Sequence, residues 1–361
     1  MKLGFLVLGF PTFNANTPYT EPLGGIESSA IFLMENLVKI GEDVRFYGEN
    51  TSDEIIRGIK HFNLKNLEDI NSQKFDALIY IGSAIFIPNL KKYIKKTPII
   101  YWTQHSYDQP AMAGLKNQQI LKNLSSIIFI SDWHEMSSIA HLNISNIKTY
   151  IIENGITPHF ENLFKNLEDF KNNKKETIGI YASTPFRGLE ALYKSSQYIN
   201  EKIKIKVFSS MSIYKSEDKI FQPLFEALKK NEKFEYNPSV SKSILADQFK
   251  SASFLTYPST FAETFCITLL DALASGLEPI ITDLGALKET SNNFGKIIDL
   301  NQPNFDKIYA EKINESIKFK NNNFNSWCVE KFSQIEEVKK KYTYINIAKK
   351  WVEIIKKIIN D

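Results

Sequence analysis

The sequence predicts an α/β protein built from two doubly wound parallel sheets. Its 361 residues are enough for two domains of about 150 to 180 residues each. Short apolar runs alternate with helical patterns along most of the chain, which is typical of parallel sheets with helices on both faces. The alternation begins at residues 2–10 and restarts at Thr177, after a polar stretch over residues 157–176. We therefore expect two similar halves joined by a linker at 157–176.

The first half, residues 1–160, opens with a continuous apolar run, as expected for a strand in a sheet that is covered on both faces. A loop then leads to Gly24 and Gly25, and the helix after it carries Leu33 and Leu37 on one face. The expected strands of this half are residues 2–10, 44–47, 75–82, 97–103, 126–131 and 148–153.

The second half, residues 174–335, repeats this organisation. A further segment, residues 342–361, is predicted to be an amphipathic helix because its apolar residues recur at helical spacing. The expected strands are residues 177–182, 205–209, 234–236, 254–257, 279–282 and 296–299. The apolar face of the last helix consists of Ile345, Ala348, Val352, Ile355 and Ile359.

Composition excludes several classes of protein. A hydrophobic content of 43% and a charged content of 24% are ordinary for a globular protein. The formal net charge of +3 is too small to indicate a nucleic-acid partner. The two cysteines, Cys266 and Cys328, form no disulfide framework, which favours a cytoplasmic location. The apolar start has no basic leader, and we expect neither a signal peptide nor a membrane span.

Residues 257–290 carry the strongest functional signal. An apolar strand ends at Tyr257, and a polar loop closes on Glu263. A nearly continuous apolar segment follows over residues 265–274, and Gly276 marks its end as a helix. Another apolar strand comes next. The unit is therefore strand, loop, helix and strand, with one carboxylate in the loop.

A second carboxylate, Asp271, lies inside this apolar helix, where burying it without a partner is costly. The first N–H groups of the helix, around Phe265, Cys266 and Ile267, are left without helical partners and form an anion site. A nucleotide sugar would satisfy all of these groups, because it offers hydroxyls to Glu263 and Asp271 and a phosphate to the helix. An ordinary buried helix with one satisfied aspartate is the alternative.

The pattern Glu263-x7-Asp271, followed by Ala-Leu-Ala-Ser-Gly, Gly285 and Glu289, resembles the donor-binding signature of GT-B glycosyltransferases of family 4. The resemblance implies two Rossmann-like domains with the ligand between the carboxyl ends of their sheets, and a last helix that returns to the first domain. It also implies that Glu263 contacts the sugar and Asp271 holds the ribose hydroxyls. The family usually has glutamate at the second acid and glycines beside the first, where this chain has Thr264.

The resemblance also covers the loop after the first strand of the second half. Family members usually place an arginine and a lysine five residues apart there to hold the diphosphate. In this chain Arg187 falls on the lysine position, and Ala182 occupies the arginine position. We therefore expect Arg187 to be the only side-chain cation at the diphosphate, with Ser183 and Thr184 as hydroxyl donors beside it.

Gly24 and Gly25 lie between the first strand and its helix. Paired glycines let the backbone approach a ligand closely, and their position matches the Gly-Gly loop of the family, which implies a contact with the donor. A plain tight turn is the alternative. Glu27 follows in the first turn of the helix, where it is expected to act as a cap.

His105 ends the strand at residues 97–103, at the carboxyl edge of the first sheet. In family 4 a histidine at this place contacts the reacting sugar, so the resemblance implies a catalytic role, although a lone histidine is also compatible with a structural one. Tyr107, Asp108 and Gln109 follow and are candidate acceptor contacts. His134, after the next strand, is expected to be a packing residue.

The sequence therefore predicts a retaining glycosyltransferase that moves a sugar from a nucleotide-sugar donor to a saccharide or glycolipid acceptor, without a metal or other cofactor. A catalytically silent GT-B subunit that binds nucleotide sugar or a partner protein is the main alternative. A short-chain Rossmann enzyme is a weaker one, because no Gly-x-Gly-x-x-Gly follows the first strand.

Residues 89–96 are basic with interleaved apolar residues. This pattern is compatible with a solvated helix face or with peripheral docking on the anionic inner leaflet of a membrane.

Overall fold

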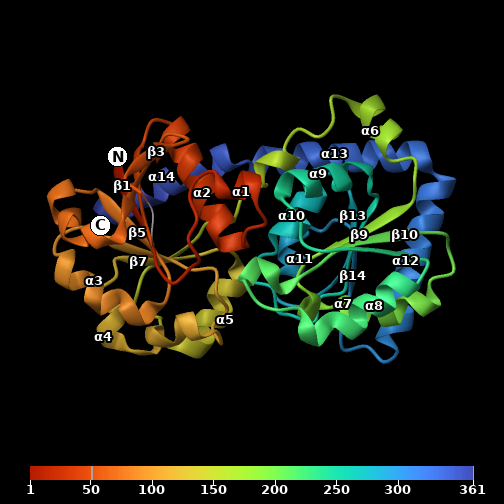
Figure 1. Cartoon of the computed structure of the whole chain (residues 1–361), viewed down its shortest axis with the longest axis horizontal. Helices are drawn as coiled ribbons and strands as arrows, with labels where there is room; N and C mark the ends of the chain where they lie inside the picture. Colours follow the sequence, from red (N-terminus) through yellow and green to blue (C-terminus); the bar gives the residue numbers. More distant parts are fainter. Residues whose placement is uncertain (50–51, 361) are drawn as a thin grey trace. The chain divides into compact units, whose positions relative to one another are not determined.

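The computed structural model describes residues 1–49 and 52–360, and within residues 65–69 the backbone alone. The chain divides into two compact units (Figure 1). The first unit comprises Met1–Pro18, Gly25–Gly155 and Tyr342–Asp361, and the second comprises Tyr19–Gly24 and Ile156–Lys341. Within the described part of the chain, no helix combines the length and apolar character that crossing a membrane requires.

Among the described residues, the first unit contains one eight-stranded sheet with the order β3-β4-β2-β1-β5-β6-β7-β8. Neighbouring strands are parallel, except that β3 and β4 form an antiparallel hairpin. The sequence did not predict that hairpin. The strands are β1 (Lys2–Val7), β2 (Asp43–Gly48), β3 (Glu54–Ile56), β4 (Ile59–Asn63), β5 (Ala77–Ile81), β6 (Ile99–Trp102), β7 (Ser126–Phe129) and β8 (Thr149–Ile151).

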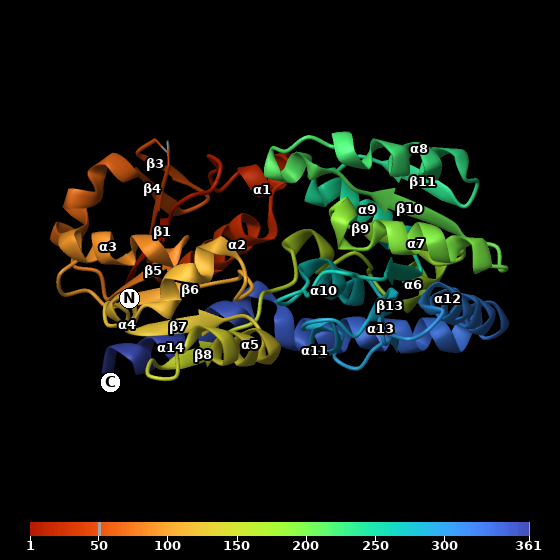
Figure 2. The ribbon, with the colours of Figure 1, turned by 90° about the horizontal axis from the view of Figure 1, so that it is seen from below.

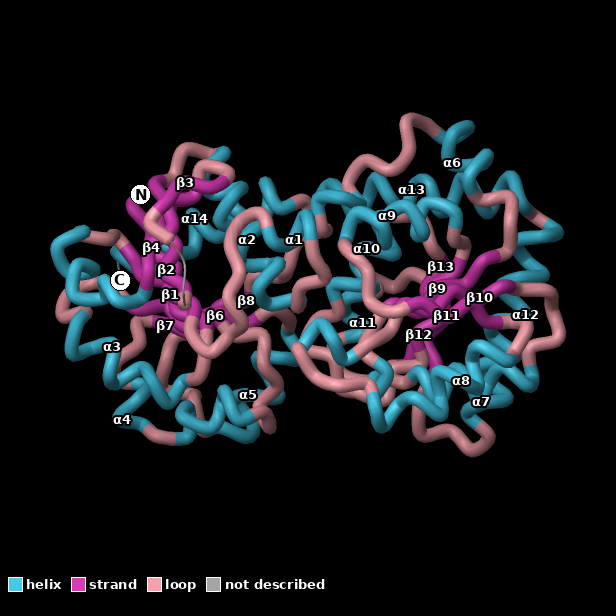
Figure 3. Tube along the Cα trace, viewed as in Figure 1, coloured by secondary structure: helices cyan, strands magenta, loops and turns pink. Residues whose placement is uncertain are grey.

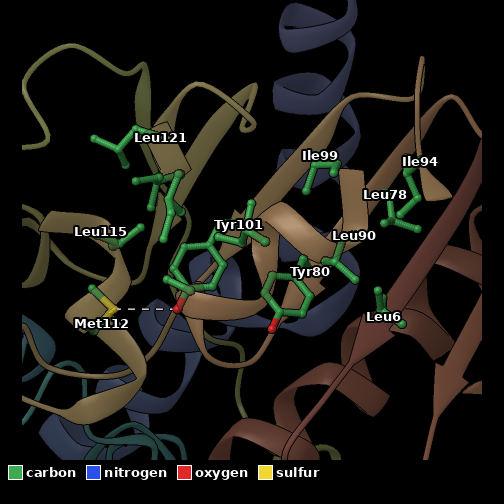
Figure 4. Packing of buried hydrophobic residues seen from close by; sticks show 14 of the residues in the cluster. Leu6, Leu78, Tyr80, Leu90, Ile94, Ile99, Tyr101, Met112, Leu115 and Leu121 are labelled. Atoms are coloured by element: carbon green, nitrogen blue, oxygen red, sulfur yellow. Dashed lines mark hydrogen bonds between the residues drawn. The ribbon is translucent and has the colours of Figure 1, made fainter. Parts of the chain in front are cut away.

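Helices cover both faces of this sheet. Figure 1 shows α2 (Gly25–Lys39) and α14 (Tyr344–Asn360) on one side. On the other side lie α3 (Ile87–Tyr93), α4 (Gln118–Leu121) and α5 (Asp132–Leu142). The alternation of side chains along a strand explains both layers. Tyr101 of β6 faces the layer of α3 and α4 (Figure 4), and its neighbour Trp102 packs on Trp351 of α14 with ring centroids 5.0 Å apart.

The helix expected over residues 342–361 belongs to the first unit as α14. Tyr344 packs on Phe32 of α2. At Gly155 a side chain would clash, because an added Cβ would lie 2.7 Å from the ring of Tyr344. Because Gly155 has no Cβ, α14 can approach the chain at the end of the segment Gly25–Gly155.

Among the described residues, the second unit contains a six-stranded parallel sheet with the order β11-β10-β9-β12-β13-β14. Figure 3 shows this sheet enclosed by helices. Tyr309 of α12 donates to the carbonyl of Ile280 in β13 at 2.7 Å. The strands are β9 (Ile178–Ala182), β10 (Lys204–Phe208), β11 (Phe234–Asn237), β12 (Phe254–Tyr257), β13 (Glu278–Thr282) and β14 (Lys296–Ile298). The helices are α6 (Leu167–Asn173), α7 (Leu189–Ser195), α8 (Gln222–Lys230), α9 (Lys242–Ser251), α10 (Ile267–Ala274), α11 (Leu287–Thr290), α12 (Phe305–Asn322) and α13 (Phe324–Tyr342). The short helix α1 (Thr17–Thr20) lies where the chain passes between the units.

Both sheets are doubly wound, so the predicted fold class is confirmed. The expected linker at 157–176 is wrong, because these residues are packed into the second unit. Phe170 of α6 is fully buried against Trp327 of α13. Lys174 is also buried, and its ammonium donates to the carbonyl of Phe249 at 2.9 Å. A few single aromatic anchors hold this polar stretch, and they leave no periodic pattern in the sequence.

Candidate functional site

The carboxyl edge of the second sheet gathers the residues expected to bind a donor. Strands β9 and β12 are neighbours in this sheet, so the loops that follow them share one edge, where open α/β sheets bind their ligands. The loop after β9 contains the short 3-10 helix η5 (Pro185–Arg187). The loop after β12 contains Glu263. Arg187 and Glu263, which are far apart in the sequence, are thereby brought together.

Arg187 and Glu263 form an ion pair. Nη1 of Arg187 donates to the two carboxylate oxygens of Glu263 at 2.9 and 3.0 Å. Nη2 donates to the hydroxyl of Tyr214 at 3.3 Å. The hydroxyl of Tyr257, at the end of β12, donates to Oε1 of Glu263. Glu263 is only 4% exposed, and these donors offset the cost of burying its carboxylate.

Aromatic rings enclose the guanidinium of Arg187. Its central carbon lies 4.5 Å from the ring centre of Phe261 and 5.5 Å from that of Phe186. Such contacts attract a cation to the face of a ring. Burial by itself would lower the pKa of Arg187, but Glu263, together with smaller contributions from Tyr257 and Tyr214, raises that pKa above its ordinary value. The side chain is therefore charged at every physiological pH.

Two glycines allow the loops to close around this pair. Gly188 has φ +109°, and a Cβ there would lie 2.1 Å from the carbonyl oxygen of Pro258. Gly285 has φ +66°, and a Cβ there would lie 2.4 Å from the carbonyl oxygen of Glu263. A larger residue at either position would push the loop after β12 away from its neighbours.

The start of α10 lies at the same edge. Thr268 in its first turn donates to the carbonyl of Ala182 at the end of β9, at 3.2 Å. Cys266 caps the helix with φ +73°, an uncommon conformation for a residue with a side chain. Burial raises the pKa of its thiol, which is therefore neutral. The expected donors Phe265, Cys266 and Ile267 lie at this helix start, whose first N–H groups have no helical partner.

Ser183 and Thr184 connect the loop after β9 to this arrangement in different ways. The hydroxyl of Ser183 lies 3.4 Å from that of Tyr257, which in turn contacts Glu263. Thr184 is 2% exposed, and among the described residues its hydroxyl has no hydrogen-bond partner. Its carbonyl accepts from the hydroxyl of Tyr181 at 2.9 Å.

Asp271 lies in α10 with a different environment. It is 2% exposed, and its Oδ1 accepts from the backbone N–H of Thr157 at 2.8 Å. Burial raises the pKa of Asp271 to about 6. The structure thus gives this carboxylate a partner within the chain, as the alternative interpretation of the sequence required.

His105 lies at the carboxyl edge of the first sheet, just after β6. Its backbone carbonyl accepts from Nε2 of His134 at 2.7 Å, and its ring lies 6.3 Å from that of Phe10. Burial lowers the pKa of His105, so its imidazole is neutral near pH 7. Burial also lowers the pKa of His134, to about 3. His134 therefore acts as a neutral donor that positions His105.

The sequence predicts a packing role for His134 but not this hydrogen bond. The bond arises because Ser131 caps α5 and accepts from the N–H of His134 at 3.0 Å. The cap fixes the first turn of α5 beside the end of β6.

The candidate acceptor residues form the turn that follows His105. Tyr107 stacks on His141 with ring centroids 3.9 Å apart. The side chain of Gln109 accepts from the N–H of Ser106 at 3.1 Å, and Asp108 is exposed. Tyr107 and Gln109 thus have structural contacts of their own.

Gly24 is buried, and Gly25 is the first residue of α2. Neither belongs to the glycines with positive φ in the described chain. Glu27 in the first turn of α2 is 7% exposed. Burial raises the pKa of this carboxyl, which contacts its own backbone N–H.

Solved structures share this architecture. A glycosyltransferase from Rickettsia africae ESF-5 is 16% identical, with a TM-score of 0.77 and 99% of both chains covered. HepE of Anabaena in complex with UDP-glucose is 12% identical, with a TM-score of 0.70 over 99% of this chain and 100% of that chain. WaaG, a glycosyltransferase involved in lipopolysaccharide biosynthesis, is 12% identical, with a TM-score of 0.66 over 98% and 99% of the two chains. The chain has the GT-B fold. No family model and no curated protein sequence matches it.

In this GT-B fold the expected site residues fall into two sets. In the second unit, Ser183 and Thr184 lie in the loop after β9, and Phe265, Cys266 and Ile267 lie at the start of α10, whereas Asp271 lies further along α10 and contacts Thr157. His105 and the three residues after it lie at the sheet edge of the first unit. Among the residues that the structure describes, no three His, Cys, Asp or Glu side chains are grouped so as to hold a metal ion.

The sequence does not predict the contacts of Phe186, Phe261 and Tyr214 with Arg187. Phe186 directly precedes Arg187 in the sequence, and Phe261 lies two residues before Glu263. An aromatic residue beside each member of a charged pair was the available signal.

Proposed function

We propose that this GT-B protein is a retaining glycosyltransferase that transfers a sugar from a nucleotide-sugar donor to a saccharide or glycolipid acceptor. The observation that carries the proposal is the ion pair between the buried Glu263 and the partly exposed Arg187, beside the start of α10. It places an acceptor of hydroxyl protons, a cation and free N–H groups at one sheet edge. The presence of UDP-glucose in the HepE structure supports a nucleoside diphosphate sugar as the donor.

Glu263 would accept a hydroxyl of the donor sugar, and Arg187 would bind the diphosphate together with the first N–H groups of α10. During transfer the bond between the anomeric carbon and the phosphate oxygen breaks. A bond to the acceptor oxygen forms on the same face, and the acceptor proton passes to the departing phosphate. Negative charge therefore accumulates on the diphosphate, where preorganised donors are most effective.

The remaining assignments follow from the resemblance and the positions of the residues. Ser183 and Thr184 would add hydroxyls to the diphosphate site. Asp271 would offer its Oδ2 to the ribose, because Oδ1 already accepts from Thr157. Gly24 and Gly25 would approach the donor through their backbone.

In the first unit we assign His105 to the reacting sugar, as a neutral imidazole. Tyr107, Asp108 and Gln109 are assigned to the acceptor. The leaving-group charge falls on Arg187 and the helix start, so we expect the reaction to need no metal and to persist in EDTA. The two buried, unpaired cysteines agree with a cytoplasmic enzyme.

A catalytically silent subunit is the second candidate. The observation in its favour is that Glu263 and Asp271 both have hydrogen-bond donors within the chain. Such a protein would bind nucleotide sugar, or a partner, without cleaving the donor.

One experiment separates the two functions. UDP-, GDP- and ADP-sugars are first screened by thermal shift, because a ligand that binds the folded state raises the melting temperature. The donor that binds is then incubated without acceptor, and release of free nucleoside diphosphate is measured for the wild type and for Glu263→Gln. Slow release by the wild type and none by the variant supports the transferase. A thermal shift without any release identifies the silent subunit.

A further inference from the structure

Charge is unevenly distributed along the first unit. Residues 77–131 contain a single acidic residue, Asp108, and no arginine. The whole chain, by contrast, has 44 basic and 41 acidic residues. The lysines of this stretch are Lys91, Lys92, Lys95, Lys96, Lys116 and Lys122.

The fold gathers this stretch on one face. Strands β5, β6 and β7 are consecutive neighbours in the sheet, and right-handed crossovers between parallel neighbours place their connections on the same side. Figures 1 and 2 show α3 and α4 close together on that side. Lys92, Lys95 and Lys96 are exposed. None of the six lysines forms an ion pair within the described part of the chain.

Exposed apolar side chains accompany the lysines. The 3-10 helix η2 (Ala84–Phe86) leads directly into α3. Ile85 is 62% exposed, Phe86 47% and Tyr93 41%. The core does not need them, because Ile87 and Leu90 of α3 and Ile94 just after it already belong to the core, where Figure 4 shows Leu90 and Ile94. Phe86 and Tyr93 are seven residues apart, which places them on one side of the helix.

We propose that η2 and α3 form a docking face for the anionic surface of a lipid bilayer. Lysines next to an anionic leaflet are attracted to its headgroups. Ile85, Phe86 and Tyr93 would enter the boundary between headgroups and acyl chains, as the apolar face of an interfacial helix does. A nucleic acid fits this face less well, because the exposed Ile85 and Phe86 would gain nothing from a phosphate backbone.

Binding to vesicles tests the proposal without any donor or acceptor, so failure of the proposed transfer reaction would not decide it. The wild type is sedimented with vesicles of phosphatidylcholine alone, or of phosphatidylcholine with phosphatidylglycerol, at about 0.15 M salt. We expect binding to the anionic vesicles only, and weaker binding as salt is raised.

The charge contribution is tested with a variant that combines Lys91→Gln, Lys92→Gln, Lys95→Gln and Lys96→Gln. Each lysine near an anionic surface contributes roughly fivefold, so partitioning should fall several hundredfold. The matched control removes the same charge from other exposed positions. It combines Lys219→Gln, Lys230→Gln, Lys288→Gln and Lys357→Gln, and it should bind like the wild type.

The apolar contribution is tested with Phe86→Ser combined with Tyr93→Ser. This variant should lose the part of the binding that persists at high salt. Its control is Ile220→Ser combined with Val329→Ser, which changes two exposed apolar residues of the second unit. The proposal would be overturned if the wild-type protein did not bind anionic vesicles. It would also be overturned if the lysine control lost as much vesicle binding as the variant of residues 91–96, or if the protein bound a short RNA and not vesicles.

Discussion

Glu263 and Asp271 belong to one strand–loop–helix segment and are both buried, yet the chain stabilises them in different ways. Glu263 receives two hydrogen bonds from Arg187 and one from Tyr257. Among the described residues, Asp271 receives neutral donors from Thr157 alone, the backbone N–H and the side-chain hydroxyl, and burial raises its pKa to about 6. A cation beside a buried carboxylate offsets the cost of burying its charge, whereas burial with neutral donors alone raises the pKa, as at Asp271. We therefore expect the role of Glu263 to depend on its charge, and the role of Asp271 to be more structural.

Removing the cation should have the largest effect. In Arg187→Ala the carboxylate of Glu263 stays buried without its partner, which typically costs 3–5 kcal/mol of stability. The diphosphate also loses its side-chain cation, so turnover should fall by about 10²–10³. Urea unfolding and donor hydrolysis measure the two effects. Arg187→Lys should recover part of the turnover, because an ammonium lacks the planar fork of the guanidinium.

A double variant separates stability from activity at this pair. Arg187→Met combined with Glu263→Gln removes both charges and should regain most of the stability lost in Arg187→Ala, without regaining turnover. Near wild-type turnover in Arg187→Ala would show that another cation holds the diphosphate.

Glu263→Gln should have the next largest effect. It keeps the volume of the side chain but removes the charged acceptor for the sugar hydroxyl, so transfer should fall by roughly 10²-fold. Arg187 loses its carboxylate partner in this variant, so UDP should bind as well as to the wild type or more tightly. Calorimetry with UDP alone, beside turnover, checks this. Equal losses in affinity and turnover would mean that Glu263 does not contact the sugar.

His105→Ala tests a site residue of the first unit, outside the segment that contains Glu263 and Asp271. A neutral hydrogen bond contributes about 1 kcal/mol, so turnover should fall by up to roughly tenfold, with donor affinity little changed. Because burial lowers the pKa of His105, its contribution should not vary between about pH 7 and 8. Steady-state kinetics across this range provides the measurement. Unchanged turnover with a lower melting temperature would make His105 structural.

Asp271→Asn should have the smallest effect on activity and a distinctive effect on stability. The folded-state pKa of about 6 lies above the ordinary value of 3.8, so the folded protein binds this proton more tightly than the unfolded chain. Stability attributable to Asp271 is therefore present below pH 3.8 and is lost as pH rises to about 6. Asparagine keeps the acceptor for Thr157 and removes the charge.

The variant should consequently be more stable than the wild type above pH 6, by up to about 3 kcal/mol. Thermal unfolding between pH 4 and 7 measures this, with the exposed Asp247→Asn as the control. A lower melting temperature at pH 7 would contradict it. Weakened binding of UDP with unchanged binding of pyrophosphate would place Oδ2 on the ribose.

The fold could be predicted because strand–helix alternation repeats along the whole chain, and because Glu263 and Asp271 stand out in an apolar segment. Their partners could not be predicted. Arg187 and Glu263 meet only because β9 and β12 are adjacent in the sheet. The local periodicity of the sequence does not determine the order of the strands.

Other features could not be predicted from the sequence, for related physical reasons. Phe170 anchors residues 157–176 through its contacts with Trp327 and Phe332 of α13, and a single anchoring residue leaves no periodic pattern in the sequence. His134 lies in the expected place, but its use as a donor to His105 depends on how α5 is capped. Such contacts are set by tertiary packing rather than by propensity.

The return of α14 to the first unit has a consequence for synthesis of the chain. Trp351 and Ile355 of α14 are buried there, yet the ribosome makes them only after the whole of the second unit. The second unit can therefore fold while translation continues, whereas the first must wait with Trp102 and Phe32 uncovered. A chain that stops at Lys341 should keep the melting transition of the second unit and lose that of the first.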